Sequence, residues 1–182
     1  MFEVEYRIAN SEYDEYIGQN GFLKIRCNNC SYGEIYPKEI YPKEIEEFMD
    51  KVSLFDWFYR LIKVVEYLET KEYVALSDVE SYNTWIVFKR INENVEISVV
   101  KAKKKDNSRD IEFELEEISD GDCGKQIVVY KQFLNEILMK TNEYIKFITE
   151  KNIDDINVNK VRQSFEKFYE KFSNFGIVSS EL

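Results

Sequence analysis

Residues 82–102 read YNTWIVFKRINENVEISVVKA and carry the clearest strand–turn–strand pattern of the chain. Residues 85–88 are continuously apolar and rich in β-branched and aromatic types, which is typical of a strand covered on both faces. In residues 95–99 apolar and polar side chains alternate, so the returning strand is predicted to be half-buried. Residues 92–94 (NEN) supply the turn, because Asn tolerates a left-handed backbone. The stretch predicts the middle of an antiparallel sheet.

The flanking sequence predicts the remaining elements from the period of its apolar side chains. Further strands are predicted at residues 2–9, 22–27, 32–36, 73–76, 111–116 and 126–130. Ser53 can cap a core helix over residues 54–68, and residues 133–148 and 158–172 have the spacing of two C-terminal helices. Trp57 and Trp85 are predicted core residues. The expected fold class is α+β, a single domain over residues 1–182 with one long helix between strands of a mainly antiparallel sheet.

Charge limits the class of partner. The 182 residues include 25 Lys and Arg against 35 Asp and Glu, a formal net charge of -10. Phosphate would be repelled, so we expect no nucleic-acid partner and favour a basic protein partner. No apolar run approaches the roughly 20 residues that span a bilayer, and the acidic start MFEVEYRIA lacks the features of a signal peptide. We therefore expect a cytoplasmic protein without a membrane partner.

Three cysteines, Cys27, Cys30 and Cys123, are expected to be reduced thiols in that compartment. Residues 27–30 (CNNC) fit a hairpin turn, whereas a redox CxxC would be expected at the start of a helix that follows a strand. Read as a zinc knuckle, the set stops at three ligands unless a carboxylate joins, since the chain has no His. We predict no metal and no cofactor.

The sequence offers little support for catalysis. The absence of His removes the Ser-His-Asp and Cys-His arrangements. There is no Walker loop or dinucleotide fingerprint, and the six glycines are scattered. A hydrolase that uses carboxylates stays open as an alternative, but the expectation is a protein that is not an enzyme.

Residues 111–116 (IEFELE) alternate so regularly that they predict a strand with a buried apolar face and an acidic outer face. Successive outward carboxylates would lie about 6.6–6.8 Å apart. Such a row is either a solvated face or a surface that attracts a basic partner. The predicted partner-binding residues here are Glu112, Glu114, Glu116, Asp120 and Asp122.

Residues 35–39 (IYPKE) are repeated directly in residues 40–44. The prolines exclude a central strand or helix interior, so the repeat is expected in a loop or on an edge. One interpretation is a slipped duplication that the surface tolerates. The other is a contact loop, in which Tyr36 and Tyr41 are candidate partner-binding residues.

A resemblance to a known family lies in YNTWI (residues 82–86), ISV (residues 97–99) and the helix-opening residues Phe133, Glu136, Ile137 and Lys140. This pattern resembles small acidic immunity proteins of bacterial polymorphic-toxin and contact-dependent inhibition systems. The resemblance implies a noncatalytic α+β domain that binds and neutralises one cognate toxin, with a nuclease as the favoured class, and it transfers no binding residue. The alternatives are a regulatory or structural interaction domain, including a homodimer, and the carboxylate hydrolase.

Overall fold

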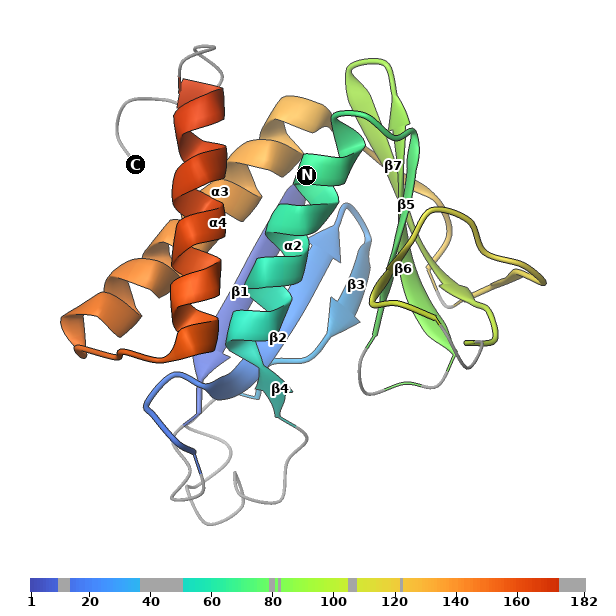
Figure 1. The fold of residues 1–182 in the computed structure, drawn as a ribbon. Helices are drawn as coiled ribbons and strands as arrows, with labels where there is room; N and C mark the ends of the chain where they lie inside the picture. The colour runs from blue at the N-terminus through green and yellow to red at the C-terminus, as the bar shows by residue number, and fades with distance from the viewer. Residues whose placement is uncertain are drawn as a thin grey trace.

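The computed structural model describes residues 1–9, 14–36, 51–78, 81, 83–104, 108–121 and 123–173. These residues form two antiparallel sheets and the helices α2 (Leu54–Leu68), α3 (Tyr130–Glu150) and α4 (Ile156–Ser173). The α+β prediction is confirmed, and the three helices fall where apolar spacing placed them. Figure 1 shows α2 near the centre, with α3 and α4 on one side of it and the larger sheet on the other.

The smaller sheet contains β1 (Phe2–Ile8), β2 (Asn20–Cys27), β3 (Cys30–Gly33) and β4 (Val52–Ser53). Its order is β1-β2-β3, and β4 also pairs with β2. The predicted partner of β2 lies earlier than expected, because the two-residue turn pairs Cys27 directly with Cys30. Asn28 adopts φ 53° in this turn, the left-handed conformation that Asn tolerates. The strand ends at Gly33, which also has a positive φ, +78°.

The larger sheet is built on the hairpin of β6 (Thr84–Ile91) and β7 (Asn94–Lys101). Its order is β10-β7-β6-β5-β8, with β9 also paired to β7, so the predicted central hairpin is confirmed. The other members are β5 (Tyr73–Ser77), β8 (Ile111–Glu112), β9 (Ser119–Asp120) and β10 (Gln126–Val129). Residues 85–88 of β6 are buried on both faces, as their continuous apolar run predicted.

The main core lies between the helices and the inner faces of the two sheets. Phe58 of α2 and Tyr144 of α3 stack there with ring centroids 4.8 Å apart, and Tyr6 of β1 meets the Phe58 ring edge-on at 5.1 Å. Both predicted core tryptophans are buried, Trp57 at 4% and Trp85 at 0% exposure. Ser53 occupies the cap position of α2, but its side chain makes no capping hydrogen bond. None of the helices in the described residues is long and apolar enough to cross a membrane.

A disulfide between Cys30 and Cys123 joins β3 of the smaller sheet to the segment that precedes β10 of the larger one. The expectation of reduced thiols is therefore wrong for this pair, which lies 93 residues apart in sequence. The side-chain amide of Asn28 strengthens the same junction by donating to the Ile127 carbonyl at 3.2 Å. Cys27 is a free, buried thiol, and burial raises its pKa to about 11. Within the described ranges, no group of three or more His, Cys, Asp or Glu residues could hold a metal ion.

Candidate functional site

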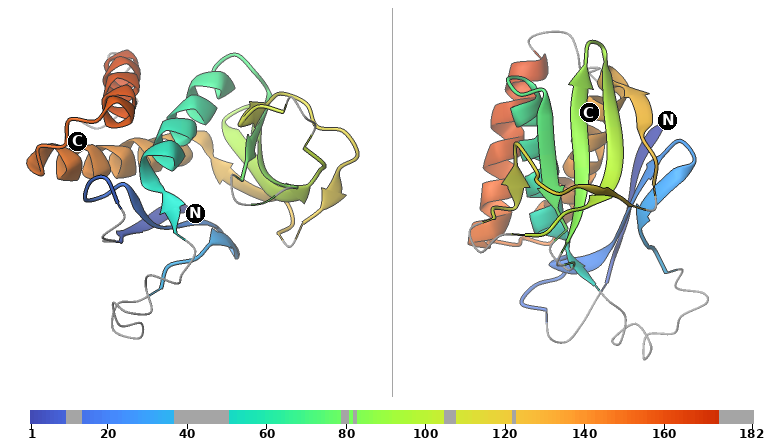
Figure 2. Two further views of the ribbon diagram at one scale, coloured as in Figure 1. Left: turned by 60° about the horizontal axis from the view of Figure 1, so that its bottom comes forward. Right: turned by 90° about the vertical axis from the view of Figure 1, so that its right-hand side faces the viewer.

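Residues 108–121, here called the strap, leave the edge of the larger sheet and cross its outer face (Figures 1 and 2). The predicted strand over residues 111–116 is wrong beyond its first two residues. β8 pairs with β5 only through Ile111 opposite Leu76 and Glu112 opposite Ala75. After the crossing, β9 pairs with Val100 and Lys101 of β7.

The burial of the strap also departs from the predicted alternation. Phe113 is 40% exposed instead of buried, while Leu115 is half-buried. Because regular pairing ends at Glu112, the three predicted glutamates do not form one row on one strand. Glu117 has φ 50°, a left-handed conformation that redirects the chain before β9.

Leu115 fixes the middle of the strap on the sheet. It packs against a second apolar cluster, formed on the outer face by Ala75, Trp85, Val87, Val100 and Ala102. The Trp85 indole N–H donates to the Ala102 carbonyl at 3.0 Å inside this cluster. The larger sheet therefore has an apolar layer on each face, and the strap covers the outer one.

The first part of the strap is held along the β5 edge by contacts with α2. The Asp110 carboxylate lies 3.3 Å from the Arg60 guanidinium, and the Asp110 carbonyl accepts the Ser77 N–H at 2.8 Å. The Phe113 ring meets Tyr67 edge-on, with centroids 5.0 Å apart, and the Lys71 ammonium lies 5.4 Å from the Phe113 centroid. These contacts give an exposed segment a defined path.

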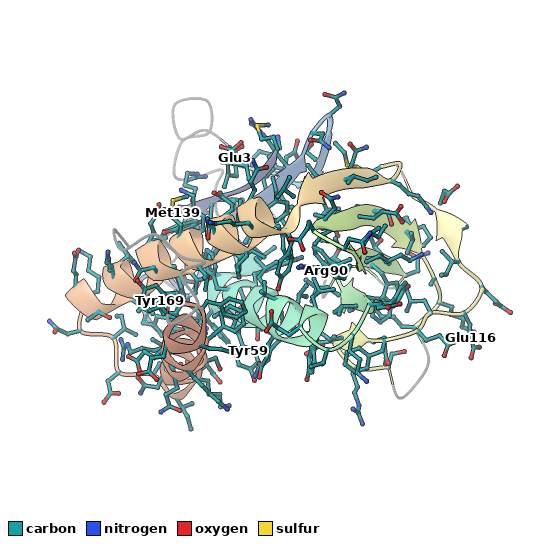
Figure 3. The ribbon with its side chains drawn as sticks, turned by 90° about the horizontal axis from the view of Figure 1, so that it is seen from above. Glu3, Tyr59, Arg90, Glu116, Met139 and Tyr169 are labelled. Atoms are coloured by element: carbon teal, nitrogen blue, oxygen red, sulfur yellow. A yellow bond between two sulfur atoms is a disulfide. The ribbon has the colours of Figure 1, made fainter. Side chains whose placement is uncertain are left out.

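The strap carries an excess of negative charge at the surface. Its carboxylates are Asp110, Glu112, Glu114, Glu116, Glu117 and Asp120, against the single cation Arg109. Except for Glu112, they are exposed, and Figure 3 shows Glu116 at the end of the molecule away from α4. The Glu112 side chain accepts the Arg109 N–H at 2.7 Å. Burial first, and then the Glu114 charge, raise the pKa of Tyr73. The predicted partner-binding residue Asp122 lies outside the described residues.

Exposed apolar side chains accompany these charges. On the strap, Ile118 is 49% exposed in addition to Phe113. Away from the strap, Ile91, Ile127 and Val129 are 43%, 58% and 45% exposed. Asn94 of β7 pairs with Ile91 of β6 and with Val129 of β10, so Ile91 and Val129 lie in one cross-strand row of the outer face. Ile127 lies on the same side of β10 as Val129. We call these three residues the apolar patch. Sequence reasoning missed it, although the period of two around the buried Val128 could have revealed it.

Tyr36 lies at a separate pocket of about 250 Å³. Its hydroxyl donates to the Glu34 carboxylate at 2.7 Å, and its ring meets Phe22 edge-on with centroids 5.4 Å apart. Trp57 lines the same pocket, so this core residue is also a pocket wall. Residues 37–50, which include Tyr41 and most of the duplicated segment, lie outside the described residues. The structure therefore separates Tyr36 from the strap, and the two form distinct candidate sites.

The comparisons with protein families, curated proteins and solved structures found no match to this chain. The features of the molecule that bear on its function are the strap, the apolar patch and the Tyr36 pocket.

Proposed function

We propose that the protein is a noncatalytic inhibitor of the immunity type, which binds a cognate bacterial toxin and covers its basic active site. A nuclease is the favoured class of toxin, because an active site that binds phosphate is rich in cationic groups. The observation that carries the proposal is the charge of the strap. It has six carboxylates and one arginine, and Leu115 packs it on the sheet. A positioned acidic surface attracts a cationic groove at a distance and orients it during encounter.

The exposed apolar side chains support a protein partner over a small ion. Stable interfaces combine an apolar centre with a polar or charged rim. Phe113 and Ile118 lie among the strap carboxylates and could supply such a centre. Leu115 packs on the outer cluster, whereas Phe113 and Ile118 leave 40% and 49% of their surface exposed to a partner.

The apolar patch favours one alternative, a noncatalytic interaction domain that forms a homodimer. Such a dimer would remove the exposed side chains of Ile91, Ile127 and Val129 from water. Removing apolar surface from water lowers the free energy of association. Sedimentation analysis over a range of concentrations tests this alternative. A dimer that Ile127→Asp dissociates would favour it, whereas a monomer at every concentration would contradict it.

The cytoplasmic location expected from composition is part of the proposal, and the disulfide opposes it. Disulfides persist in oxidising compartments, while the cytosol keeps thiols reduced. An inhibitor located in the cytoplasm would therefore function with Cys30 and Cys123 as reduced thiols. Retained toxin binding after reduction is the outcome that the proposal requires.

The test is co-expression with a toxin domain encoded immediately next to this chain, followed by kinetic measurement of the purified pair. Glu114→Lys with Glu116→Lys should abolish protection and slow association at least about tenfold at low salt. The matched control is Glu150→Lys with Glu166→Lys on α3 and α4, two exposed positions that change the net charge equally. Equal effects of the two double variants would show that only the overall charge matters and would overturn the role of the strap.

A further inference from the structure

Aromatic rings supply four of the nine described residues that line the Tyr36 pocket. It lies where β2, β3, α2 and the end of β5 meet, and its aromatic lining residues are Phe22, Tyr32, Tyr36 and Trp57. Phe22 and Trp57 are buried at 1% and 4% exposure, so two of the four rings are fixed by the core. The volume of about 250 Å³ lies below the range of roughly 300–1,000 Å³ for drug-sized ligands. It suits one long side chain or a small organic ion.

Two carboxylates complete the pocket, and a tyrosine contacts each of them. The Tyr36 hydroxyl donates to Glu34 at 2.7 Å, and the Tyr32 hydroxyl donates to Asp78. Each of these hydrogen bonds holds a carboxylate beside the aromatic rings of the pocket wall. Among the lining residues that the structure describes there is no Lys or Arg. The lining thus combines negative charge with the π-faces of aromatic rings.

Two neighbouring cations have other contacts. Lys104 donates from its ammonium to the backbone carbonyls of Asp78 and Ser81, and its pKa is lowered by burial, which the Asp78 and Asp110 charges oppose. The Arg7 guanidinium lies 4.5 Å from the centroid of Phe22 but does not line the pocket. Because Arg7 already lies over the Phe22 ring, the aromatic contacts of a bound cation would come from the less buried Tyr32 and Tyr36 rings.

We propose that this pocket binds a guanidinium or ammonium group, supplied by an Arg or Lys side chain of the partner protein. Aromatic faces and carboxylates both attract such a group, and Arg is enriched among the residues that dominate binding energy at interfaces. The source of the cation rests on the proposed function, but the chemistry of the pocket does not. Asp78 directly follows Ser77, whose N–H binds the strap residue Asp110, so the pocket adjoins the start of the strap.

Binding is tested with the whole protein and two small probes of nearly equal shape, N-butylguanidinium and its neutral counterpart N-butylurea. The signal of the Trp57 indole N–H in NMR spectra reports occupancy, since Trp57 lines the pocket. N-butylguanidinium should shift this signal saturably and bind at least about tenfold more tightly than N-butylurea. Equal affinities, or no shift with either probe, would overturn the proposal.

Variants then connect the affinity to the carboxylates. Glu34→Gln and Asp78→Asn should each weaken N-butylguanidinium binding by about fivefold, while Tyr36→Phe, which keeps the ring, should change it less. Glu150→Gln on α3 is the matched control and should have no effect. Asp78→Asn could unfold the protein, so its melting temperature is compared with wild type. The exposed Glu34 keeps the test decisive in that case, and unchanged affinity in Glu34→Gln would contradict the proposal.

The same variants distinguish the pocket from the wider function. If no toxin binds while N-butylguanidinium still binds with the expected dependence on Glu34, the pocket is correct and the immunity proposal fails. If the toxin binds but neither probe does, the pocket proposal fails and the strap stands alone.

Discussion

At the residue scale, the indole of Trp85 combines packing with a hydrogen bond in the outer cluster. The residue is fully buried and donates to the Ala102 carbonyl at 3.0 Å. Trp85→Ala leaves a cavity, so the free energy of unfolding should fall by about 3–5 kcal/mol. Trp85→Phe retains a ring but leaves the carbonyl unpaired, which costs about 1–3 kcal/mol. Denaturant titration measures both losses, and a Trp85→Ala protein as stable as wild type would contradict the core assignment.

Glu136 of α3 predicts a pH dependence. Its carboxylate accepts the Val4 N–H at 2.9 Å, and burial raises its pKa although that hydrogen bond lowers it. At pH 7 the group is ionised in both states, and the folded state carries the cost of a half-buried charge. Below the unfolded pKa of about 4.3 both states are protonated, so this cost disappears as the pH falls through the folded and then the unfolded pKa.

Glu136→Gln removes the charge and keeps an oxygen that can accept the Val4 N–H. We expect the variant to be more stable than wild type at pH 7, with a difference that shrinks as the pH falls to about 4. Urea unfolding of both proteins at several pH values measures the difference and cancels the other titrating groups. A variant less stable than wild type at pH 7 would show that the charged hydrogen bond outweighs the burial of the carboxylate.

At the element scale, the strap should open independently of the rest of the fold. Beyond its α2 contacts at Asp110 and Phe113, Leu115 is the strap side chain that packs on the outer cluster, and the strap has few ladder hydrogen bonds. Few such contacts are typical of a segment with low local stability. Leu115→Ser should raise hydrogen exchange in residues 112–119 at least about tenfold while α2 and α3 stay protected. Ile118→Ser is the control, because Ile118 is 49% exposed. Equal effects would mean that Leu115 does not fix the strap.

At the scale of the whole molecule, the disulfide connects the two sheets over a long loop. For a sequence separation of 93, the chain-entropy model gives a contribution of about 4–5 kcal/mol. Reduction, or the Cys30→Ser and Cys123→Ser double variant, should lower the free energy of unfolding by that amount. Under denaturing conditions the untreated protein should present one reactive thiol, Cys27. Three reactive thiols before reduction would contradict the bond.

The sequence by itself determined the elements whose neighbours lie close in the chain. The hairpin of residues 82–102 and the helices α2, α3 and α4 were predictable, because the period of their apolar side chains reflects a face that must be buried. The alternation in residues 111–116 satisfied the same rule and predicted the wrong structure. It predicted burial for Phe113, which is 40% exposed, because a local period cannot show where a partner strand ends.

Only the tertiary structure decided the path of the strap, the disulfide and the Tyr36 pocket. β8 pairs with β5 through two residues only, and the chain then crosses the face of the sheet, where Leu115 packs on the outer cluster. Cys30 meets Cys123, and Tyr32 meets Asp78, because separate elements bring distant residues together. Such meetings depend on how two sheets and three helices pack on one core, and a local hydrophobic period carries no information about that packing.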